Sequence, residues 1–174
     1  MSESPAPSLS SSSTLFMIFL ALNTVAAFIN HIDDTDETFG YWEPLHYLLY
    51  GTGMQTWEYS PEFAIRTYSF ISFFYPFAWA YKFIGLSKPE IFLGVRLILG
   101  SFTAYAESRL ISSIEKVFGS AYMRMTLVVL LFSPGIFFSA TSFLPSAVAM
   151  SLTMLFLASW LQGDFVAAIA WACT

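Results

Sequence analysis

The sequence predicts an all-α protein that crosses a membrane several times. Of its 174 residues, 56% are hydrophobic and only 11% are charged, whereas a soluble domain usually carries about 25% charged residues. Long segments without any charge recur along the chain. Between the first two lies an acidic stretch, residues 31–65, that is too polar for the hydrocarbon core of a bilayer. We therefore expect transmembrane helices and a first loop outside the membrane.

The charge distribution excludes some classes of partner. The net charge is −5, and seven of the twelve acidic residues lie between Asp33 and Glu62, with no Lys or Arg before Arg66. Nucleic-acid binding requires a basic surface, which this chain lacks. The single Cys173 excludes an internal disulfide and a thiolate metal cluster.

The N-terminal region predicts a tail followed by a first span. Residues 1–13 are rich in Ser and Pro and lack any basic residue, which is typical of a short disordered tail, here expected in the cytosol. Thr14–Asn30 has seventeen residues without a charge, enough for a helix of about 25 Å. The segment lacks the flank and cleavage site of a secretory signal. It is therefore predicted to begin a transmembrane domain over residues 14–174.

The loop 31–65 contains the pattern of a short helix. Pro44 suits a first helical position, where a missing amide hydrogen has no cost, and Gly51 suits a helix end. The residues Leu45, Leu48 and Leu49 fall on one face. We expect Pro44–Tyr50 to form a helix on the membrane surface, with these leucines against lipid or neighbouring spans.

The remainder of the chain predicts four or more further apolar segments. Ser60-Pro61-Glu62 has the pattern of a helix start and is expected to begin the helix that re-enters the bilayer. Residues 125–161 are uncharged and too long for one crossing, and they contain a turn signal. Because the last apolar segment has only just begun, we expect the chain to be part of a longer protein. The predicted spans are Thr67–Tyr81, Ile91–Ala106, two within 125–161 separated by a turn at Thr141–Ser146, and one beginning with Phe165–Thr174.

Basic residues give only part of the orientation. Lys82 and Lys88 favour a cytosolic loop, which would place residues 31–65 on the lumenal side. Three later basic residues also favour the cytosol, although a third full crossing would put them in the lumen. The sequence leaves the topology after Lys88 open. The three residues are Arg109, Lys116 and Arg124.

The run HIDDTDETFGYWEPLH concentrates titratable groups at residues 31–46. Crowded carboxylates repel one another, and desolvation beside aromatic residues acts in the same direction, which is the environment of a general base. A solvated acidic surface and a weak Asp-x-Asp metal motif at Asp34-Thr35-Asp36 are the alternatives. His46 fits a ligand, a phosphate partner or an interfacial residue. The candidates are Asp33, Asp34, Asp36, Glu37, Glu43 and His46.

The segment DETFGYWEPLHYLLYGTGMQTWEYSPEFAIRTY resembles the first-loop signature of glycosyltransferase family 22, and FSPGIFFSATSFLPSAVAM resembles a later segment of that family. The resemblance extends from about His31 to the end of the chain. It implies a GT-C fold in the endoplasmic-reticulum membrane, with a lumenal active site under the first loop. The implied donor is dolichyl-phosphate mannose and the acceptor a dolichyl-diphosphate oligosaccharide, joined in α-1,2 linkage with inversion. Neither a metal nor another cofactor is implied.

The resemblance also assigns roles to residues. Asp36-Glu37 corresponds to the family's acidic pair, so Asp36 is expected to be the catalytic base and Glu37 its catalytic neighbour, with Asp33 and Asp34 as rivals. A cation is expected to face the departing phosphate, either Arg66 or a residue outside this chain. Two positions depart from the family pattern: Gly40 replaces a common Asn and Thr35 a common Cys. The substrate-binding set is Asp33, Asp34, Glu43, His46 and Arg66.

Two other functional classes remain open. A transporter or channel requires charged residues inside the spans, for which Arg96 and Glu107 are the only candidates. A non-catalytic scaffold subunit of a glycosylation complex would also carry a solvated acidic loop, and the sequence does not exclude it.

Overall fold

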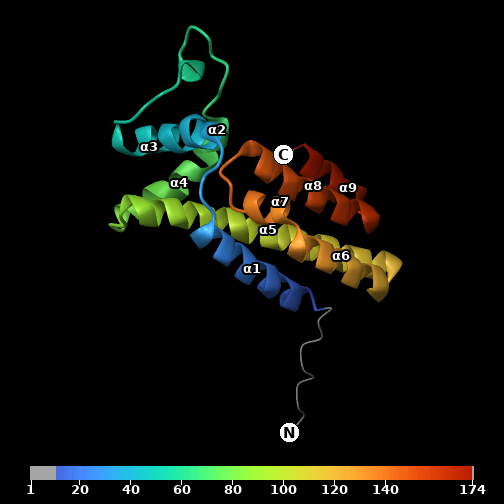
Figure 1. Ribbon diagram of the computed structural model, residues 1–174. Coiled ribbons are helices and arrows are strands. Elements are labelled where there is room, and N and C mark those ends of the chain that lie inside the picture. Colours follow the sequence, from blue (N-terminus) through green and yellow to red (C-terminus); the bar gives the residue numbers. More distant parts are fainter. Residues whose placement is uncertain (1–10, 174) are drawn as a thin grey trace.

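In the computed structural model, which describes residues 11–173, every regular element is a helix (Figure 1). The predicted all-α class is confirmed. Of the expected tail 1–13, residues 1–10 lie outside the described residues. The elements are α1 (Ser12–Ile29), α2 (Thr35–Glu37), the π-helix η1 (Thr38–Trp42), α3 (Glu43–Tyr50), the 3₁₀-helix η2 (Trp57–Tyr59), α4 (Ser69–Phe83), α5 (Lys88–Phe118), α6 (Ser120–Phe132), α7 (Pro134–Ser139), α8 (Pro145–Leu161) and α9 (Phe165–Ala172).

The helix α5 organises the bundle. Its 31 residues extend roughly 46 Å, and α1, α4, α6 and α8 all pack against it (Figure 1). On α1, Leu15 and Phe19 are fully buried in a cluster with Ala104 and Ile111 of α5. By length and composition, α1 is the one helix in the described residues that qualifies as a membrane span.

The predicted third span, Ile91–Ala106, is too short. The helix starts at a capping box in which Ser87 and Glu90 bond each other's backbone groups, and it continues until Gly119, whose φ of 92° favours glycine. Neither Glu107 nor the following Arg109 ends it. The expected boundary was therefore wrong, because the charged residues do not leave the bundle.

Two charged residues inside α5 are instead held by polar partners. Arg96 donates from Nη1 to the Asn30 carbonyl at 2.7 Å and from Nη2 to Thr141 Oγ1 at 3.0 Å. The Glu107 carboxylate accepts from Asn23 Nδ2 at 3.1 Å. These bonds tie α5 to α1 and to the α7–α8 turn. Both charged residues therefore act as structural ties between helices, although Arg96 Nε and Glu107 Oε1 are buried without a partner in the described residues.

The prediction that Ser60-Pro61-Glu62 begins a helix was wrong. The Ser60 carbonyl accepts from the amides of Phe63 and Ala64, and Ala64 has a φ of 45°. The amides of Ile65 and Arg66 then donate to the Glu58 carbonyl. The chain therefore folds back on itself, and α4 begins only at Ser69.

The predicted second span, Thr67–Tyr81, corresponds to α4, whose C-terminal end returns to the acidic loop. The Lys82 ammonium bonds the Leu49 carbonyl, and the ammonium groups of Lys82 and Lys88 lie 4.4 and 4.8 Å from the centroid of the Tyr50 ring. The α4–α5 turn therefore contacts the end of α3. Because α3 belongs to the acidic loop, α4 ends beside the loop that precedes it. The side of a membrane on which this loop and Lys82 lie stays a prediction. With 15 residues, α4 spans only about 22 Å.

The predicted short helix is confirmed and longer than expected. Helix α3 ends at Gly51, whose φ is 71°, and α2 and η1 precede it without a break from Thr35. Leu45 and Leu49 are buried in a cluster with residues of α4 and α5. These two leucines pack against neighbouring helices as predicted. Leu48 is 38% exposed, so its expected contact with lipid stays a prediction.

The segment 125–161 contains the predicted turn and one further break. Residues 140–144 separate α7 from α8, which confirms the turn near Thr141–Ser146. The first of the two expected helices divides into α6 and α7 at Ser133, because Pro134 starts a new helix and cannot continue the old one. The last apolar segment is helical as α9.

Candidate active site

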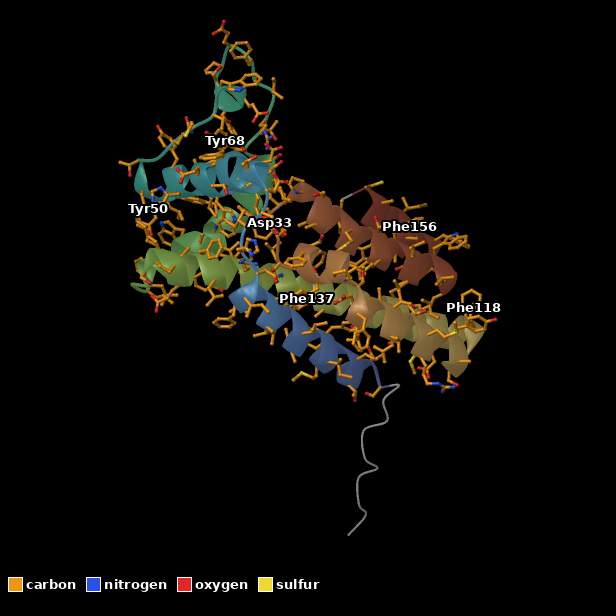
Figure 2. All side chains as sticks on the ribbon, in the orientation of Figure 1. Asp33, Tyr50, Tyr68, Phe118, Phe137 and Phe156 are labelled. Carbon is orange, nitrogen blue, oxygen red and sulfur yellow. The ribbon has the colours of Figure 1, made fainter. Side chains whose placement is uncertain are left out.

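The acidic segment follows directly after α1, and Figure 2 shows its first acid, Asp33, between the end of α1 and the helices α2 and α3. Its anchor is Glu37, which is 4% exposed. The Glu37 Oε1 atom accepts from Trp42 Nε1 at 3.0 Å and from the Phe143 amide at 2.8 Å. A buried carboxylate needs such donors. This pair of bonds fixes the segment to the α7–α8 turn, whose Thr141 is held by Arg96.

Asp36 lies beside this anchor and remains open to solvent, with 67% of its side chain exposed. Its Oδ2 atom is 3.1 Å from Arg66 Nη2, and its amide donates to Asp34 Oδ1 at 2.8 Å. Within residues 11–173 the structure gives Asp36 Oδ1 no partner. One carboxylate oxygen is therefore oriented by an arginine while the other is free to accept a proton.

Arg66 is the cation of the site and is only 16% exposed. Its Nε atom is 2.7 Å from Glu58 Oε2, and its guanidinium lies 5.3 Å from the centroid of the Tyr41 ring. Burial opposes the positive charge, but the hydrogen bonds to Asp36 and Glu58 outweigh it and raise the pKa of Arg66. Arg66 therefore stays charged between two carboxylates.

Gly40 makes room for this arginine. A Cβ atom at residue 40 would lie 2.1 Å from Arg66 Nη1, so any other residue requires the guanidinium to move. The Gly40 carbonyl also accepts from the Tyr59 hydroxyl at 2.6 Å. Burial, with Tyr41 nearby, raises the pKa of Tyr59 to about 12, so this hydroxyl keeps its proton at neutral pH.

The other acids of the run have separate uses. The Asp33 carboxylate lies 2.6 Å from His31 Nε2 in an exposed pair. Asp34 caps α2 by accepting from the Asp36 amide. The two ends of the Asp34-Thr35-Asp36 tripeptide thus have different partners. In the part of the chain that the structure describes, no three His, Cys, Asp or Glu side chains lie close enough to hold a metal ion.

Glu43 and His46 contact the backbone of the loop that follows α3. We call residues 51–66 the finger loop. Glu43 Oε2 accepts from the Met54 amide at 3.0 Å, and His46 Nδ1 donates to the Thr52 carbonyl at 2.9 Å. A Cβ atom at Gly53 would lie 3.1 Å from both side chains. Their expected role in substrate binding stays a prediction beside this structural one.

Sequence reasoning missed several residues that build the site. Glu58 and Tyr59 carried no signal beyond their place in an acidic, aromatic loop. Phe143 lies 106 residues from Glu37 and contributes a backbone amide, which no sequence pattern indicates. Tyr41 was recognisable only as an aromatic residue, although its ring packs against Phe70 at 5.3 Å and forms the floor under Arg66.

An apolar groove of about 570 Å³ begins close to this floor. Phe70, which contacts Tyr41, is one of its lining residues, and the others belong to α8 and α9. Its lining is mostly aliphatic and aromatic, so it suits a hydrocarbon chain rather than a polar ligand. The other lining residues are Pro145, Val148, Ala149, Leu152, Thr153, Phe156, Trp171 and Ala172.

Comparison with known proteins gives consistent relatives. The chain is 41% identical to the α-1,2-mannosyltransferase alg9 of Schizosaccharomyces pombe over 162 residues, which cover 92% of this chain and 28% of that protein. It is 39% identical to the human α-1,2-mannosyltransferase ALG9 over 149 residues, 85% of this chain and 24% of that protein. The Drosophila melanogaster protein of the same name is 39% identical over 171 residues, 95% of this chain and 27% of that protein. No solved structure matches the chain.

The family assignment covers nearly the whole chain. The chain spans about a quarter of the length of the curated relatives it matches. The family match itself extends over residues 14–173 and includes the acidic segment, the finger loop and the helices that hold them. The chain belongs to the Alg9-like mannosyltransferase family.

Proposed function

We propose that this chain carries the catalytic base of a membrane enzyme that transfers mannose in α-1,2 linkage. The donor is dolichyl-phosphate mannose and the acceptor a dolichyl-diphosphate oligosaccharide, in the lumen of the endoplasmic reticulum. Family membership supports the sugar and the linkage, since the relatives are named α-1,2-mannosyltransferases. The same membership supports a multi-spanning GT-C fold for the longer protein.

The observation that carries the proposal is the state of Asp36. Of the four acids at 33–37, Asp36 alone combines an exposed carboxylate, a fixed orientation from Arg66 and an oxygen without a partner in residues 11–173. Asp33 is paired with His31, and Asp34 caps a helix. Glu37 is buried. A general base must be positioned and still reach the substrate.

The reaction then needs one proton acceptor. Asp36 takes the proton from the 2-hydroxyl of the acceptor mannose, and the oxygen attacks the anomeric carbon of the donor from the face opposite the phosphate. The bond from that carbon to the phosphate oxygen breaks, and dolichyl phosphate leaves with the bonding electrons. A β-linked donor thereby gives an α-linked product.

The neighbours of Asp36 divide the supporting roles. Arg66 orients the base, because its Nη2 and Nε atoms are both engaged by carboxylates, and its predicted contact with the donor phosphate would have to use Nη1. Glu37 fixes the segment that carries Asp36. The apolar groove at Phe70 gives the isoprenoid part of a lipid-linked substrate a place close to the base.

The structure also supports a consistent membrane topology. If α1 enters the lumen and α4 stays on the lumenal side with α3, then α5 is the helix that returns to the cytosol. Lys116 and Arg124 then lie in the cytosol, as the positive-inside rule requires. In this proposed topology α4 is not a crossing, and the conflict between the positive-inside rule and simple alternation disappears.

This topology predicts the result of a glycosylation test in the full-length protein. Met54→Asn creates an Asn-Gln-Thr acceptor in the finger loop, and Phe118→Asn creates an Asn-Gly-Ser acceptor at the end of α5. We expect Met54→Asn alone to add a glycan that an endoglycosidase removes.

Gly85→Cys, in a protein without other cysteines, should react with an impermeant maleimide only after sealed microsomes are opened. Glycosylation at residue 118, or labelling of residue 85 in sealed microsomes, would contradict the topology.

The activity itself is tested with purified full-length protein. We expect transfer of mannose from dolichyl-phosphate mannose to the lipid-linked oligosaccharide, with the new residue released by an α-1,2-specific mannosidase. A protein that binds both lipids but transfers nothing would favour the scaffold alternative.

A further inference from the structure

The finger loop presents large apolar side chains that no other described residue covers. Trp57 and Phe63 are 60% and 53% exposed, and their ring centroids lie 5.2 Å apart with the planes nearly perpendicular. Met54 and Ile65 of the same loop are also exposed. Figure 1 shows the loop projecting beyond α3, on the side away from α1. Several exposed apolar side chains gathered in one loop indicate a surface that binds another molecule.

The surface is held in a fixed position rather than left loose. His46 and Glu43 bond the backbone at Thr52 and Met54. At the other end, the Tyr59 hydroxyl bonds the Gly40 carbonyl, and the Ile65 amide donates to the Glu58 carbonyl. A surface that is already ordered loses little conformational entropy on binding.

Its charge restricts the chemical class of the ligand. The acids beside the aromatic pair are Glu58 and Glu62, and no Lys or Arg precedes Arg66. Arg66 is already engaged by two carboxylates. Phosphates, nucleic acids and anionic lipid surfaces would meet the carboxylate of Glu62 and no uncommitted Lys or Arg in the finger loop. A neutral sugar fits instead, because its hydroxyl groups can donate to carboxylates while its carbon–hydrogen face packs on an aromatic ring.

The loop is joined directly to the proposed base. Trp57 precedes Glu58, whose carboxylate is 2.7 Å from Arg66, and Arg66 is 3.1 Å from Asp36. We propose that Trp57 and Phe63 form a carbohydrate-binding platform, which holds inner sugars of the oligosaccharide acceptor while its terminal mannose lies at Asp36. This inference rests on the proposed function and adds to it a residue-level site for the acceptor glycan.

The test compares two acceptors with the full-length enzyme. One is the complete lipid-linked oligosaccharide, and the other is a lipid-linked acceptor shortened to the terminal mannose residues. We expect Trp57→Ala and Phe63→Ala to raise KM for the complete acceptor about tenfold, the scale of removing one aromatic contact, with kcat unchanged. KM for the short acceptor should stay the same. Trp79→Ala, which removes an exposed tryptophan on α4, is the matched control and should change neither constant.

Several results would overturn the platform. The first is an unchanged KM for the complete acceptor in both variants. The second is an equal rise in KM for both acceptors, since the loop would then affect the position of Asp36 and not the binding of inner sugars. If the two variants lose binding of a protein partner while KM stays unchanged, the finger loop is a protein-binding surface instead. If Trp57→Ala misfolds, Trp57→Leu keeps apolar volume without the ring and should show the same selective rise in KM. An inactive wild-type enzyme would instead refute the proposed function.

Discussion

Replacing Asp36 by Asn should reduce the turnover of the full-length enzyme by about 10²–10⁴-fold, the usual contribution of a general base. The amide keeps the size of the side chain and can still accept a hydrogen bond from Arg66, but it cannot take up the proton of the acceptor hydroxyl. Binding of dolichyl-phosphate mannose should therefore persist. The measurement is mannose transfer to the lipid-linked acceptor by purified protein, together with donor binding.

Neighbouring carboxylates provide matched controls for this substitution. Asp33→Asn and Asp34→Asn should retain most of the turnover, because these side chains pair with His31 and cap α2. Glu37→Gln keeps an oxygen that can accept from Trp42 and from the Phe143 amide, so a positioning role predicts partial activity. Collapse in Asp33→Asn or Asp34→Asn with near-normal turnover in Asp36→Asn would reassign the base. Near-normal turnover in all three aspartate variants would remove the segment from the mechanism, and full loss in Glu37→Gln would give Glu37 a chemical role.

A second large effect is expected on stability. Arg96→Met should lower the free energy of unfolding by about 3 kcal/mol or more, because two hydrogen bonds to a charged group are lost at about 1.5–3 kcal/mol each. The Asn30 carbonyl and Thr141 hydroxyl would then remain in the interior without their donor. The measurement is the midpoint of thermal unfolding in detergent and the abundance of the full-length protein in microsomes.

The comparison variant for this effect is Arg124→Met, which removes the same group from an exposed position on α6. It should leave both readouts close to those of the wild type, because exposed charges contribute little. Arg96→Lys keeps the charge but has no planar fork to reach two acceptors, and should fall between the two. Equal stability of Arg96→Met and Arg124→Met would show that the buried contacts are not needed.

Local patterns predicted the elements that local chemistry determines. The helix ending at Gly51 followed from Pro44 and the spacing of the leucines, and the turn after α7 followed from Pro145 and its polar neighbours. The importance of the acidic run followed from its composition and the family resemblance. These features depend on residues within about ten positions of one another, so sequence reasoning could reach them.

Tertiary contacts determined the rest. The sequence predicted a span at α4 from its apolar residues, and the contact of Lys82 with the end of α3 could not be read from the sequence. The length of α5 depends on buried partners for Arg96 and Glu107, contributed by α1 and the α7–α8 turn. The different roles of Asp36 and Glu37 likewise depend on their contacts with Arg66 and with the Phe143 amide, which are distant in sequence.

The bond between Glu37 and the Phe143 amide sets an order of events during biosynthesis. Its partners are 106 residues apart, and at about 5–20 residues per second the second emerges roughly 5–20 s after the first. Until then the Phe143 amide cannot donate to the Glu37 carboxylate, which must remain hydrated. The acidic segment therefore reaches its final position only after the α7–α8 turn has been made, and it is synthesised first as an undocked chain.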